Sequence, residues 1–321
     1  MHYAQLVREI VCGSGLGAAD AHRLFGAMLD GGVPELELGA LLVALRMKGE
    51  SSAELAGFHA AAAERAHRLA PPDTDVRTVV LPSYGSPAAQ PNLTALVALL
   101  LQRMGVPVLV HGALESHAGI GTAYVLRELG ALPCATLAQA QAALDRDRLA
   151  FVPTAVIAPG LASLLALRAR LGVCASAQLA ARLVDPFAGA SLRVIGLASS
   201  AALAVVRELL LSTGERAIVF QGAEGEPFAD PRQRPRIERF DDGGVQVLFE
   251  QELAATERGV PVARDARATA GYIRRVLDGA APVPLPILNQ IACCLFGAGA
   301  TVDLAGAKAR AAVQTHGLAS A

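Results

Sequence analysis

Leu81-Pro-Ser-Tyr-Gly-Ser-Pro-Ala-Ala-Gln-Pro-Asn-Leu-Thr94 is the stretch of sequence from which the fold is inferred. An apolar segment, Val76 to Leu81, runs into this turn-forming stretch, and the apolar run Ala95 to Leu101 follows it. The pattern predicts a β-strand that delivers a loop to a helix N-terminus, which Asn92 or Thr94 caps. Unpaired N–H groups and the positive end of the helix dipole converge at such a place. We therefore expect phosphate as the ligand of the loop, although the stretch itself holds no charged side chain.

The first 70 residues have the apolar spacing of several short amphipathic helices. Gly31-Gly32 and Lys48-Gly49 interrupt the pattern, and Ser51 with Glu54 forms a capping box at the start of a further helix. Helices this short cannot each bury a face alone. They predict a small helical domain and a subunit interface, with a domain boundary at Ala70-Pro-Pro-Asp73.

Strand and helix patterns alternate after this boundary. The expected strands are Val76–Leu81, Val106–Val110, Phe151–Ile157, Leu192–Leu197, Ala217–Phe220, Pro235–Phe240 and Val245–Glu250. The expected helices are one that reaches Met104, then Gly121–Gly130, Leu161–Leu183, Ser200–Leu211, Ala263–Leu277 and a segment from Pro286 to about Gly317. Strands separated by helices indicate βαβ units and a mainly parallel sheet. Asp241-Asp-Gly-Gly244 predicts a hairpin turn between the last two strands.

These patterns predict a two-domain fold of the α+β and α/β classes. We expect a small all-helical N-terminal domain, residues 1–70, with helices from about 161–184 packed on it. We expect residues 71–160 and 185–321 to form a larger α/β domain, in which helices flank a mainly parallel central sheet.

Composition narrows the class of protein. The 321 residues are 53% hydrophobic but only 4% aromatic, which favours packed helices and buried parallel strands over an aromatic stacking surface. The formal net charge of -1 does not by itself indicate a nucleic-acid partner. Five scattered cysteines do not suit a disulfide framework, and no apolar run is long enough to span a bilayer. We expect a cytoplasmic protein without membrane partners.

Six segments, in collinear order over nearly the whole chain, resemble the anthranilate phosphoribosyltransferase superfamily, whose fold is shared with pyrimidine nucleoside phosphorylases. Leu45-Arg-Met-Lys-Gly-Glu-Ser-Ser-Ala-Glu-Leu-Ala-Gly57 is similar to that family's helical-domain signature. The other segments are Val110–Gly112, Gly121–Gly130, Leu167–Gly172 with Asp185-Pro186, Arg193–Gly196 and Ala217–Gly222. The resemblance implies the two-domain outline inferred above.

The catalytic positions implied by the resemblance have changed. The enzymes bind the pyrophosphate of phosphoribosyl pyrophosphate with Gly-Thr-Gly-Gly-Asp and Asn-Ile-Ser-Thr, where this chain has Pro82-Ser-Tyr-Gly-Ser86 and Asn92-Leu-Thr-Ala95. The family's Lys-His-Gly-Asn-Arg is Val110-His-Gly-Ala-Leu114 here. Ser86, Asn92, Thr94 and His111 are thus vestigial catalytic candidates. His111 has lost its partners, so we expect it to bond a backbone group rather than to transfer a proton.

The magnesium acids of the family have changed as well. The Gly-Leu-Asp-Glu motif of the enzymes is matched by Gly225-Glu-Pro-Phe228, which leaves Glu224 and Glu226 as weak, out-of-register metal candidates. Transfer chemistry needs neutralisation of the leaving group by such charges. We therefore expect no active anthranilate phosphoribosyltransferase and no cofactor.

These departures resemble a branch of the superfamily outside tryptophan synthesis that binds nucleic acid without sequence preference as a homodimer. Resemblance to this branch implies the same function, with dimerisation through the N-terminal helical domain. Arg232, Arg234, Arg236 and Arg239 are spaced along an extended segment and form the first candidate phosphate-binding set. Arg264, Arg267, Arg274 and Arg275 form the second. The alternative for both sets is a solvated surface with pairs to nearby acids.

Two other functions remain open from the sequence. One is a glycosyltransferase-like or phosphoribosyltransferase-like enzyme that acts on a phosphorylated ribose donor with Mg²⁺, using the Pro82–Thr94 loop and Glu224 or Glu226. In that case Arg168, which matches the arginine facing the aromatic substrate in the enzymes, lines the substrate cleft. The other is a scaffold for a protein partner.

Overall fold

The computed structural model describes residues 2–85, 90–115, 119–173, 176–253 and 265–316. Its first helices are α1 Tyr3–Val11, α2 Ala18–Leu29, α3 Glu35–Lys48 and α4 Ser52–Arg65. The helices of the middle of the chain are α5 Thr94–Arg103, α6 Thr122–Glu128, α7 Leu137–Asp147, α8 Thr154–Ile157, α9 Pro159–Ala166, α10 Arg168–Leu171 and α11 Ser176–Arg182. The last are α12 Ser200–Thr213, α13 Ala266–Leu277, α14 Leu285–Gly297 and α15 Leu304–His316, with a 3-10 turn, η1, at Ala223–Gly225.

One seven-stranded sheet forms the centre of the larger part of the molecule, in the order β3-β2-β1-β4-β5-β7-β8. The strands of the first half are β1 Val79–Ser83, β2 Val108–Gly112, β3 Leu149–Pro153 and β4 Leu192–Leu197. Those of the second half are β5 Ala217–Gln221, β6 Gln233–Arg234, β7 Ile237–Asp241, β8 Gly244–Phe249 and β9 Glu252–Leu253. Strands β1 to β5 pair in parallel, β7 and β8 are antiparallel, and β6 with β9 makes a separate ribbon. The predicted fold class is confirmed.

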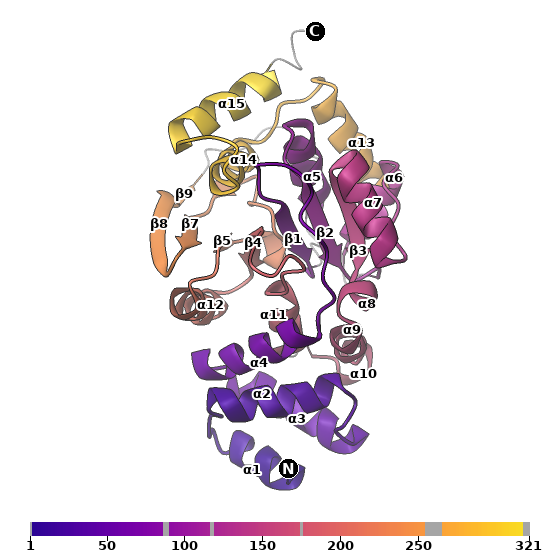
Figure 1. Cartoon of the computed structure of the whole chain (residues 1–321), viewed down its shortest axis with the longest axis vertical. Helices are drawn as coiled ribbons and strands as arrows, with labels where there is room; N and C mark the ends of the chain where they lie inside the picture. The colour runs from indigo at the N-terminus through magenta and orange to yellow at the C-terminus, as the bar shows by residue number, and fades with distance from the viewer. Residues whose placement is uncertain (1, 86–89, 116–118, 174–175, 254–264, 317–321) are drawn as a thin grey trace.

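Helices cover the sheet, and the N-terminal bundle lies at one end of the molecule (Figure 1). Helices α5, α13 and α14 pack on the sheet with one apolar core, and α12 packs against β4 and β5 with another. A third core joins α2, α3 and α4 to α9 and α11. The helices of residues 159–182 therefore lie between the bundle and the sheet, while the domain boundaries drawn from the sequence stay a prediction.

Strand β1 occupies the middle of the sheet although Pro82 lies within it. Proline has no N–H to donate to a sheet ladder. Strand β4 pairs with β1 only at Val79 and Val80, so Pro82 lies beyond the end of that ladder. The strand begins three residues later than the predicted Val76 and reaches Ser83, which carries it into the loop.

Some predicted boundaries are wrong for identifiable reasons. The expected strand Phe151–Ile157 ends at Pro153, which serves as N-cap of α8. The helical segment expected over Leu161–Leu183 consists of α9, α10 and α11, and α10 ends where Gly172 adopts a left-handed φ of 72°. Helix α7 was not expected at all. The hairpin turn is confirmed, with positive φ at Asp242 and Gly243 between β7 and β8.

The capping box of α4 is confirmed. The Ser51 hydroxyl accepts from the Glu54 N–H, and the Glu54 carboxylate accepts from the Ser51 N–H and from Lys48 Nζ. Burial acts to raise the pKa of Glu54, but its bonds to Lys48 and Ser51 outweigh this and lower it. Among the described helices, none is long and apolar enough to cross a membrane.

Candidate functional site

The carboxyl ends of β1, β2 and β3 meet at one edge of the sheet, where they face the N-terminal bundle. This edge is the usual ligand-binding position of an open parallel sheet. Ser83, Gly112 and Pro153 end the three strands in register. The turn η1, which follows β5, reaches the same edge and brings Glu226 to the β1–α5 loop.

Glu226 is fully buried, and its carboxylate lies in a cradle of hydrogen-bond donors. Its Oε1 accepts from the Gly85 N–H at 2.5 Å. Its Oε2 accepts from the hydroxyls of Ser83 at 2.6 Å and Thr94 at 2.8 Å. The Thr122 hydroxyl and the Asn92 amide lie farther from Oε2, at 3.2 and 3.3 Å. Within the described part of the chain, no Arg or Lys forms an ion pair with this carboxylate.

Asn92 also positions the cradle. Its Nδ2 donates to the Ile120 carbonyl and to the Thr122 hydroxyl, both at 2.9 Å. Its Oδ1 accepts from the Thr94 N–H at 3.1 Å. The sequence predicted Asn92 or Thr94 as the helix cap, but Leu93 is the N-cap of α5 and makes no side-chain cap bond. The side chains of both predicted residues also bond the Glu226 carboxylate, so an acid of the chain itself occupies the donors of the loop, while phosphate binding there stays a prediction.

Three positions that pack against the Glu226 turn have no room for a side chain. A Cβ atom on Gly85 would lie 2.9 Å from Glu226 Cγ. A Cβ atom on Gly196 or on Gly222 would clash with the Glu226 carbonyl oxygen. Three glycines from three segments are thus required for the turn to enter this edge of the sheet.

The cradle does not fit a magnesium ion. Mg²⁺ needs carboxylate oxygens with free lone pairs in an octahedral arrangement. Both Glu226 oxygens accept bonds from donors, and Glu224 is exposed. Among the described residues, no three His, Cys, Asp or Glu side chains come together as a metal site.

Tyr84 replaces a glycine of the family motif and fills space beside the cradle. Its hydroxyl bonds His111 Nδ1 at 2.9 Å and accepts from the Thr154 hydroxyl at 3.1 Å. Burial raises the pKa of Tyr84 and lowers the pKa of His111 to about 4, although Asp185 opposes the latter shift. The phenol therefore stays protonated and donates to a neutral imidazole. His111 Nδ1 bonds the Tyr84 side chain, and a backbone hydrogen bond with Val184, of the kind that we predicted, also opposes the lowering of the His111 pKa.

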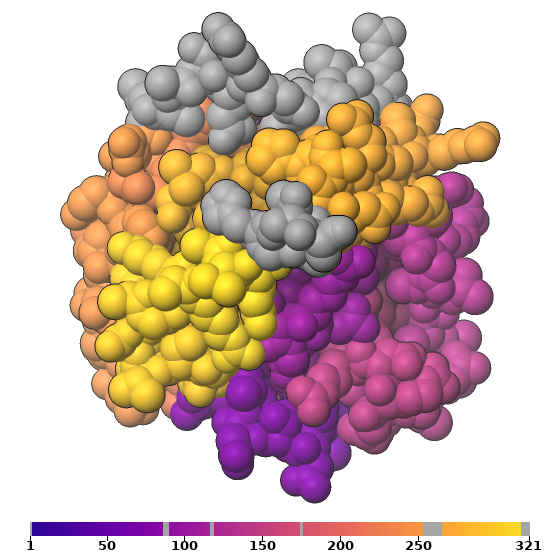
Figure 2. Space-filling model, turned by 90° about the horizontal axis from the view of Figure 1, so that it is seen from above, coloured from indigo at the N-terminus to yellow at the C-terminus, as the bar shows by residue number. Residues whose placement is uncertain are grey.

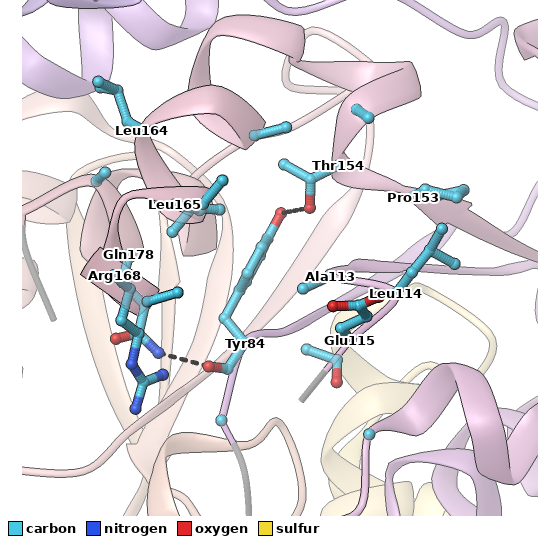
Figure 3. Close-up of a pocket in the computed structure, with 18 of the residues that line it drawn as sticks. Tyr84, Ala113, Leu114, Glu115, Pro153, Thr154, Leu164, Leu165, Arg168 and Gln178 are labelled. Atoms are coloured by element: carbon cyan, nitrogen blue, oxygen red, sulfur yellow. Dashed lines mark hydrogen bonds between the residues drawn. The ribbon is translucent and has the colours of Figure 1, made fainter. Parts of the chain in front are cut away.

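A cavity of about 450 Å³ opens next to Tyr84, between the sheet edge and the helices of residues 159–178. Figure 3 shows Tyr84 crossing it toward Thr154, with Arg168 and Gln178 on one side and Leu114 and Glu115 on the other. The Gln178 amide donates to the Tyr84 carbonyl. Most of the other lining residues are apolar. Ser83, Gly85 and Thr122 line the cavity as well as the cradle, so the two share a wall.

Arg168 is half-buried in this cavity wall, and no described acid forms an ion pair with it. The structure thus brings Arg168 to the same edge of the sheet as His111, Asn92 and Thr94. Ser86, the remaining vestigial candidate, lies outside the described residues.

The first predicted arginine set lies on β6 and β7 and in the segments beside them, away from this edge. All four guanidinium groups are paired with acids. Arg232 bonds Asp230, Arg234 bonds Glu252, Arg236 bonds Glu238 and Glu250, and Arg239 bonds Asp241. Side chains held in this way have little free charge to offer a phosphate.

The second arginine set is arranged differently. Arg267, Arg274 and Arg275 are exposed on α13, and Arg264 lies outside the described residues. Helix α13 packs against α6, whose exposed Arg127 lies over the Tyr124 ring and was not predicted as a site residue. Arg274 donates to the Glu128 carbonyl. Among the described residues, no ion pair involves Arg127 or the three exposed arginines of α13.

Comparison with known proteins assigns the family. Residues 4–66 match the helical bundle domain of the glycosyl transferase family. The chain is 37% identical to a protein of Escherichia coli K12, uncharacterized protein YbiB, over 97% of this chain and 98% of that one. It is 28% identical to the anthranilate phosphoribosyltransferase of Rhodospirillum rubrum over 96% of this chain and 89% of the enzyme. The chain belongs to the anthranilate phosphoribosyltransferase superfamily.

Solved structures of this superfamily have the same fold. The anthranilate phosphoribosyltransferase of Thermus thermophilus superposes with a TM-score of 0.78 at 26% identity, over 98% of this chain and 94% of the enzyme. The Saccharomyces cerevisiae enzyme, solved with PRPP and Mg, gives 0.77 at 14% identity, which supports the fold alone. The chain is thus more similar in sequence to YbiB than to the Rhodospirillum enzyme.

Proposed function

We propose that this chain binds nucleic acid without sequence preference, as a homodimer, and does not transfer phosphoribose. The observation that carries the proposal is the arginine face of α6 and α13, which consists of Arg127, Arg267, Arg274 and Arg275. These two helices hold four arginines and one acid, Glu128, with Asp265 and Asp278 at the ends of α13, and none of the four guanidinium groups is ion-paired among the described residues. Exposed arginine side chains can contact backbone phosphates without contacting base edges.

The arginine face lies on the side of the molecule away from the N-terminal bundle. Figure 2 looks onto this side, where the orange residues of α13 lie beside the magenta residues of α6. The face carries few aromatic side chains for base stacking, so affinity comes from phosphate contacts and is strongly salt-dependent.

A homodimer doubles the number of phosphate contacts that one particle can make. Helix α3 supports dimerisation, because Leu36 and Met47 are 83% and 81% exposed and lie on one face of the helix, together with Val43. Large apolar side chains in such a stripe favour burial against a second copy. The bundle is therefore the dimerisation surface that we propose.

The arrangement of the site supports the proposed loss of transferase chemistry. The family's loop acid and Lys-His-Gly-Asn-Arg cations are replaced, Tyr84 fills the glycine position, and Glu226 holds the donors that would bind a phosphate. A second negative charge brought against a buried carboxylate is repelled. Binding of phosphoribosyl pyrophosphate in the resting arrangement is therefore unfavourable.

The test is fluorescence anisotropy of a labelled single-stranded oligonucleotide at several salt concentrations. We expect the logarithm of the affinity to fall linearly with the logarithm of salt concentration. Replacing Arg267, Arg274 and Arg275 with Ala is expected to weaken binding at least tenfold and to flatten the salt slope. The matched control replaces Arg232, Arg234 and Arg236 with Ala. Equal losses of affinity in both variants would show that binding depends on net charge alone and not on the arginine face. The absence of binding at low salt would overturn the proposal.

The cavity supports a second function, a phosphoribosyltransferase-like enzyme on a phosphorylated ribose donor. Arg168 is a cation without an acidic partner in the described structure, in a 450 Å³ cavity with mostly apolar walls. A small apolar acid fits this combination. Isothermal titration with phosphoribosyl pyrophosphate and Mg²⁺, and separately with aromatic acids, tests it. Binding that is lost in Arg168→Met would support the enzyme, and the absence of binding to either would exclude it.

A further inference from the structure

Most polar side chains in the wall of the 450 Å³ cavity bond other groups of the protein. Hydrogen bonds within the chain involve the side chains of Ser83, Tyr84, Thr122, Thr154 and Gln178. Arg168 and Glu115 are the exceptions, because neither forms an ion pair or a side-chain hydrogen bond with a residue that the structure describes. The described wall therefore leaves one positive and one negative side chain for a ligand.

The two charges lie on opposite sides of the Tyr84 ring (Figure 3). Arg168 is half-buried on α10, and Glu115 is exposed in the segment that follows β2. Opposite charges attract one another, yet these two line the same cavity without forming an ion pair. A ligand that carries a negative charge at one end and a positive charge at the other is complementary to both.

The Tyr84 ring between the two charges is fixed at both ends. Its hydroxyl bonds His111 Nδ1 and Thr154, and its carbonyl accepts from the Gln178 amide. A ring held in this way presents an apolar surface that a ligand does not have to order. Much of the remaining wall is apolar as well, with Leu42, Leu164, Leu165, Leu171 and Val173.

We propose that this cavity binds a short zwitterion, a dipeptide with apolar side chains, whose carboxylate pairs with Arg168 and whose ammonium group pairs with Glu115. The two charged groups of a single amino acid share one carbon atom and lie too close together to reach both sides of the Tyr84 ring. A peptide unit separates them, and apolar side chains suit the wall. The inference rests on the cavity of the second function proposed above, but it needs neither nucleic acid nor a phosphoribose donor.

The test is isothermal titration of the whole chain with leucyl-phenylalanine, its N-acetyl form and its C-terminal amide. The N-acetyl form lacks the ammonium group, and the amide lacks the carboxylate. We expect affinity to fall about tenfold for the amide, since Arg168 is half-buried, and about threefold for the N-acetyl form, since Glu115 is exposed. Phenylalanine alone should bind more weakly than the dipeptide.

Two variants assign the ends of the ligand. In Glu115→Gln the free and N-acetyl dipeptides should bind equally, and in Arg168→Met the free dipeptide and its amide should bind equally. Exposed residues outside the cavity provide the controls, Glu208→Gln on α12 and Arg146→Met on α7, and both should retain the wild-type order of affinities.

The proposal is overturned if the wild type does not bind the free dipeptide or binds phenylalanine as tightly. An N-acetyl dipeptide that binds the wild type as tightly as the free form would also overturn it. That result would describe a cavity for simple acids and would leave the second proposed function standing. A loss on acetylation that persists in Glu115→Gln would show that the acetyl group is excluded by its size, which contradicts pairing of the ammonium group with Glu115.

Discussion

Glu215 accepts a hydrogen bond from His59 Nε2 at 2.9 Å and thereby joins helix α4 of the N-terminal bundle to the loop before β5. Its second oxygen accepts from Arg193 of β4 at 2.7 Å. Arg193 is 2% exposed and also donates to the Leu183 carbonyl. This triad links helix α4 of the bundle to strand β4 of the sheet through the Glu215 carboxylate.

We predict that the triad makes stability depend on acid pH. Burial acts to raise the pKa of Glu215, but the hydrogen bond from His59 and the charge of Arg193 outweigh it and lower that pKa from 4.5 to about 2. A folded-state pKa below the unfolded value stabilises the fold above pH 4.5, and the stabilisation is lost as pH falls toward 2. The loss should be about 2 kcal/mol, since partial exposure reduces the effect of the shift. Urea unfolding midpoints between pH 7 and pH 2.5 measure it.

Glu215→Gln is the variant for this prediction. Glutamine has nearly the same volume as glutamate and can still form hydrogen bonds, but it carries no charge. The stability of the variant should therefore fall less steeply than that of the wild type below pH 4.5. Charge removal at the exposed Glu208 of α12 should leave the acid dependence unchanged. Parallel pH profiles for the wild type and Glu215→Gln would contradict the assignment.

The fold could largely be predicted from the sequence, because its signals are local. Strand β4 was predicted with its observed bounds, since Leu192–Leu197 is a short apolar run bounded by turn signals. Helix α7 was missed because only Ala140 and Leu144 are buried in it, which leaves no clear apolar period. A cap signal was present, since the Thr136 hydroxyl accepts from the Gln139 N–H.

The site could be predicted only in part. The loop after β1 was located because strand, turn residues and helix follow one another directly. Its ligand, Glu226, lies 143 residues from Ser83 along the chain, and no local pattern reports such a pairing. Tyr84 was identified as a changed glycine, but its bond to His111 depends on how two adjacent strands end in register.

Tyr84→Phe should destabilise the fold by about 1 to 3 kcal/mol. The change removes the donor to His111 Nδ1 and leaves a buried neutral imidazole with an unpaired acceptor. The Thr154 hydroxyl loses its acceptor as well. Urea unfolding at pH 7 measures the loss. Tyr124→Phe, at an exposed tyrosine of α6, is the matched control, and a Tyr84→Phe variant as stable as that control would show that the bond contributes nothing.

Charged residues on α3 should separate the proposed dimer. Leu36→Glu with Met47→Glu places two carboxylates in the exposed apolar stripe, where burial against a second copy is then unfavourable. Sedimentation equilibrium should report a mass near 33.0 kDa for this variant and twice that value for the wild type. Val302→Asp changes a side chain that is 98% exposed elsewhere and should leave the dimer intact. A double variant that stays dimeric would place the interface on another surface.

Gly57 allows α2 and α4 to pack closely, and Gly57→Ala should be strongly destabilising. An added Cβ would lie 2.6 Å from the His22 backbone nitrogen and 2.7 Å from the Ala21 Cβ, and neither helix backbone can move without opening the core. Overpacking of this kind costs about 1 to 3 kcal/mol. The bundle should lose stability in urea while the spectrum of the native state is retained.

Gly271→Ala should increase stability, in contrast to Gly57→Ala, although both glycines lie inside helices. Gly271 lies inside α13 with no atom within 4 Å of an added Cβ, and its φ is not in the left-handed region. Alanine there should raise helix stability by about 0.5 to 1 kcal/mol, because glycine loses more backbone entropy on folding. The same urea titration compares the two variants. Equal losses of stability in Gly57→Ala and Gly271→Ala would contradict this prediction. They would show that replacing any helical glycine destabilises the protein, and that the close contact of α2 with α4 is not the reason for glycine at position 57.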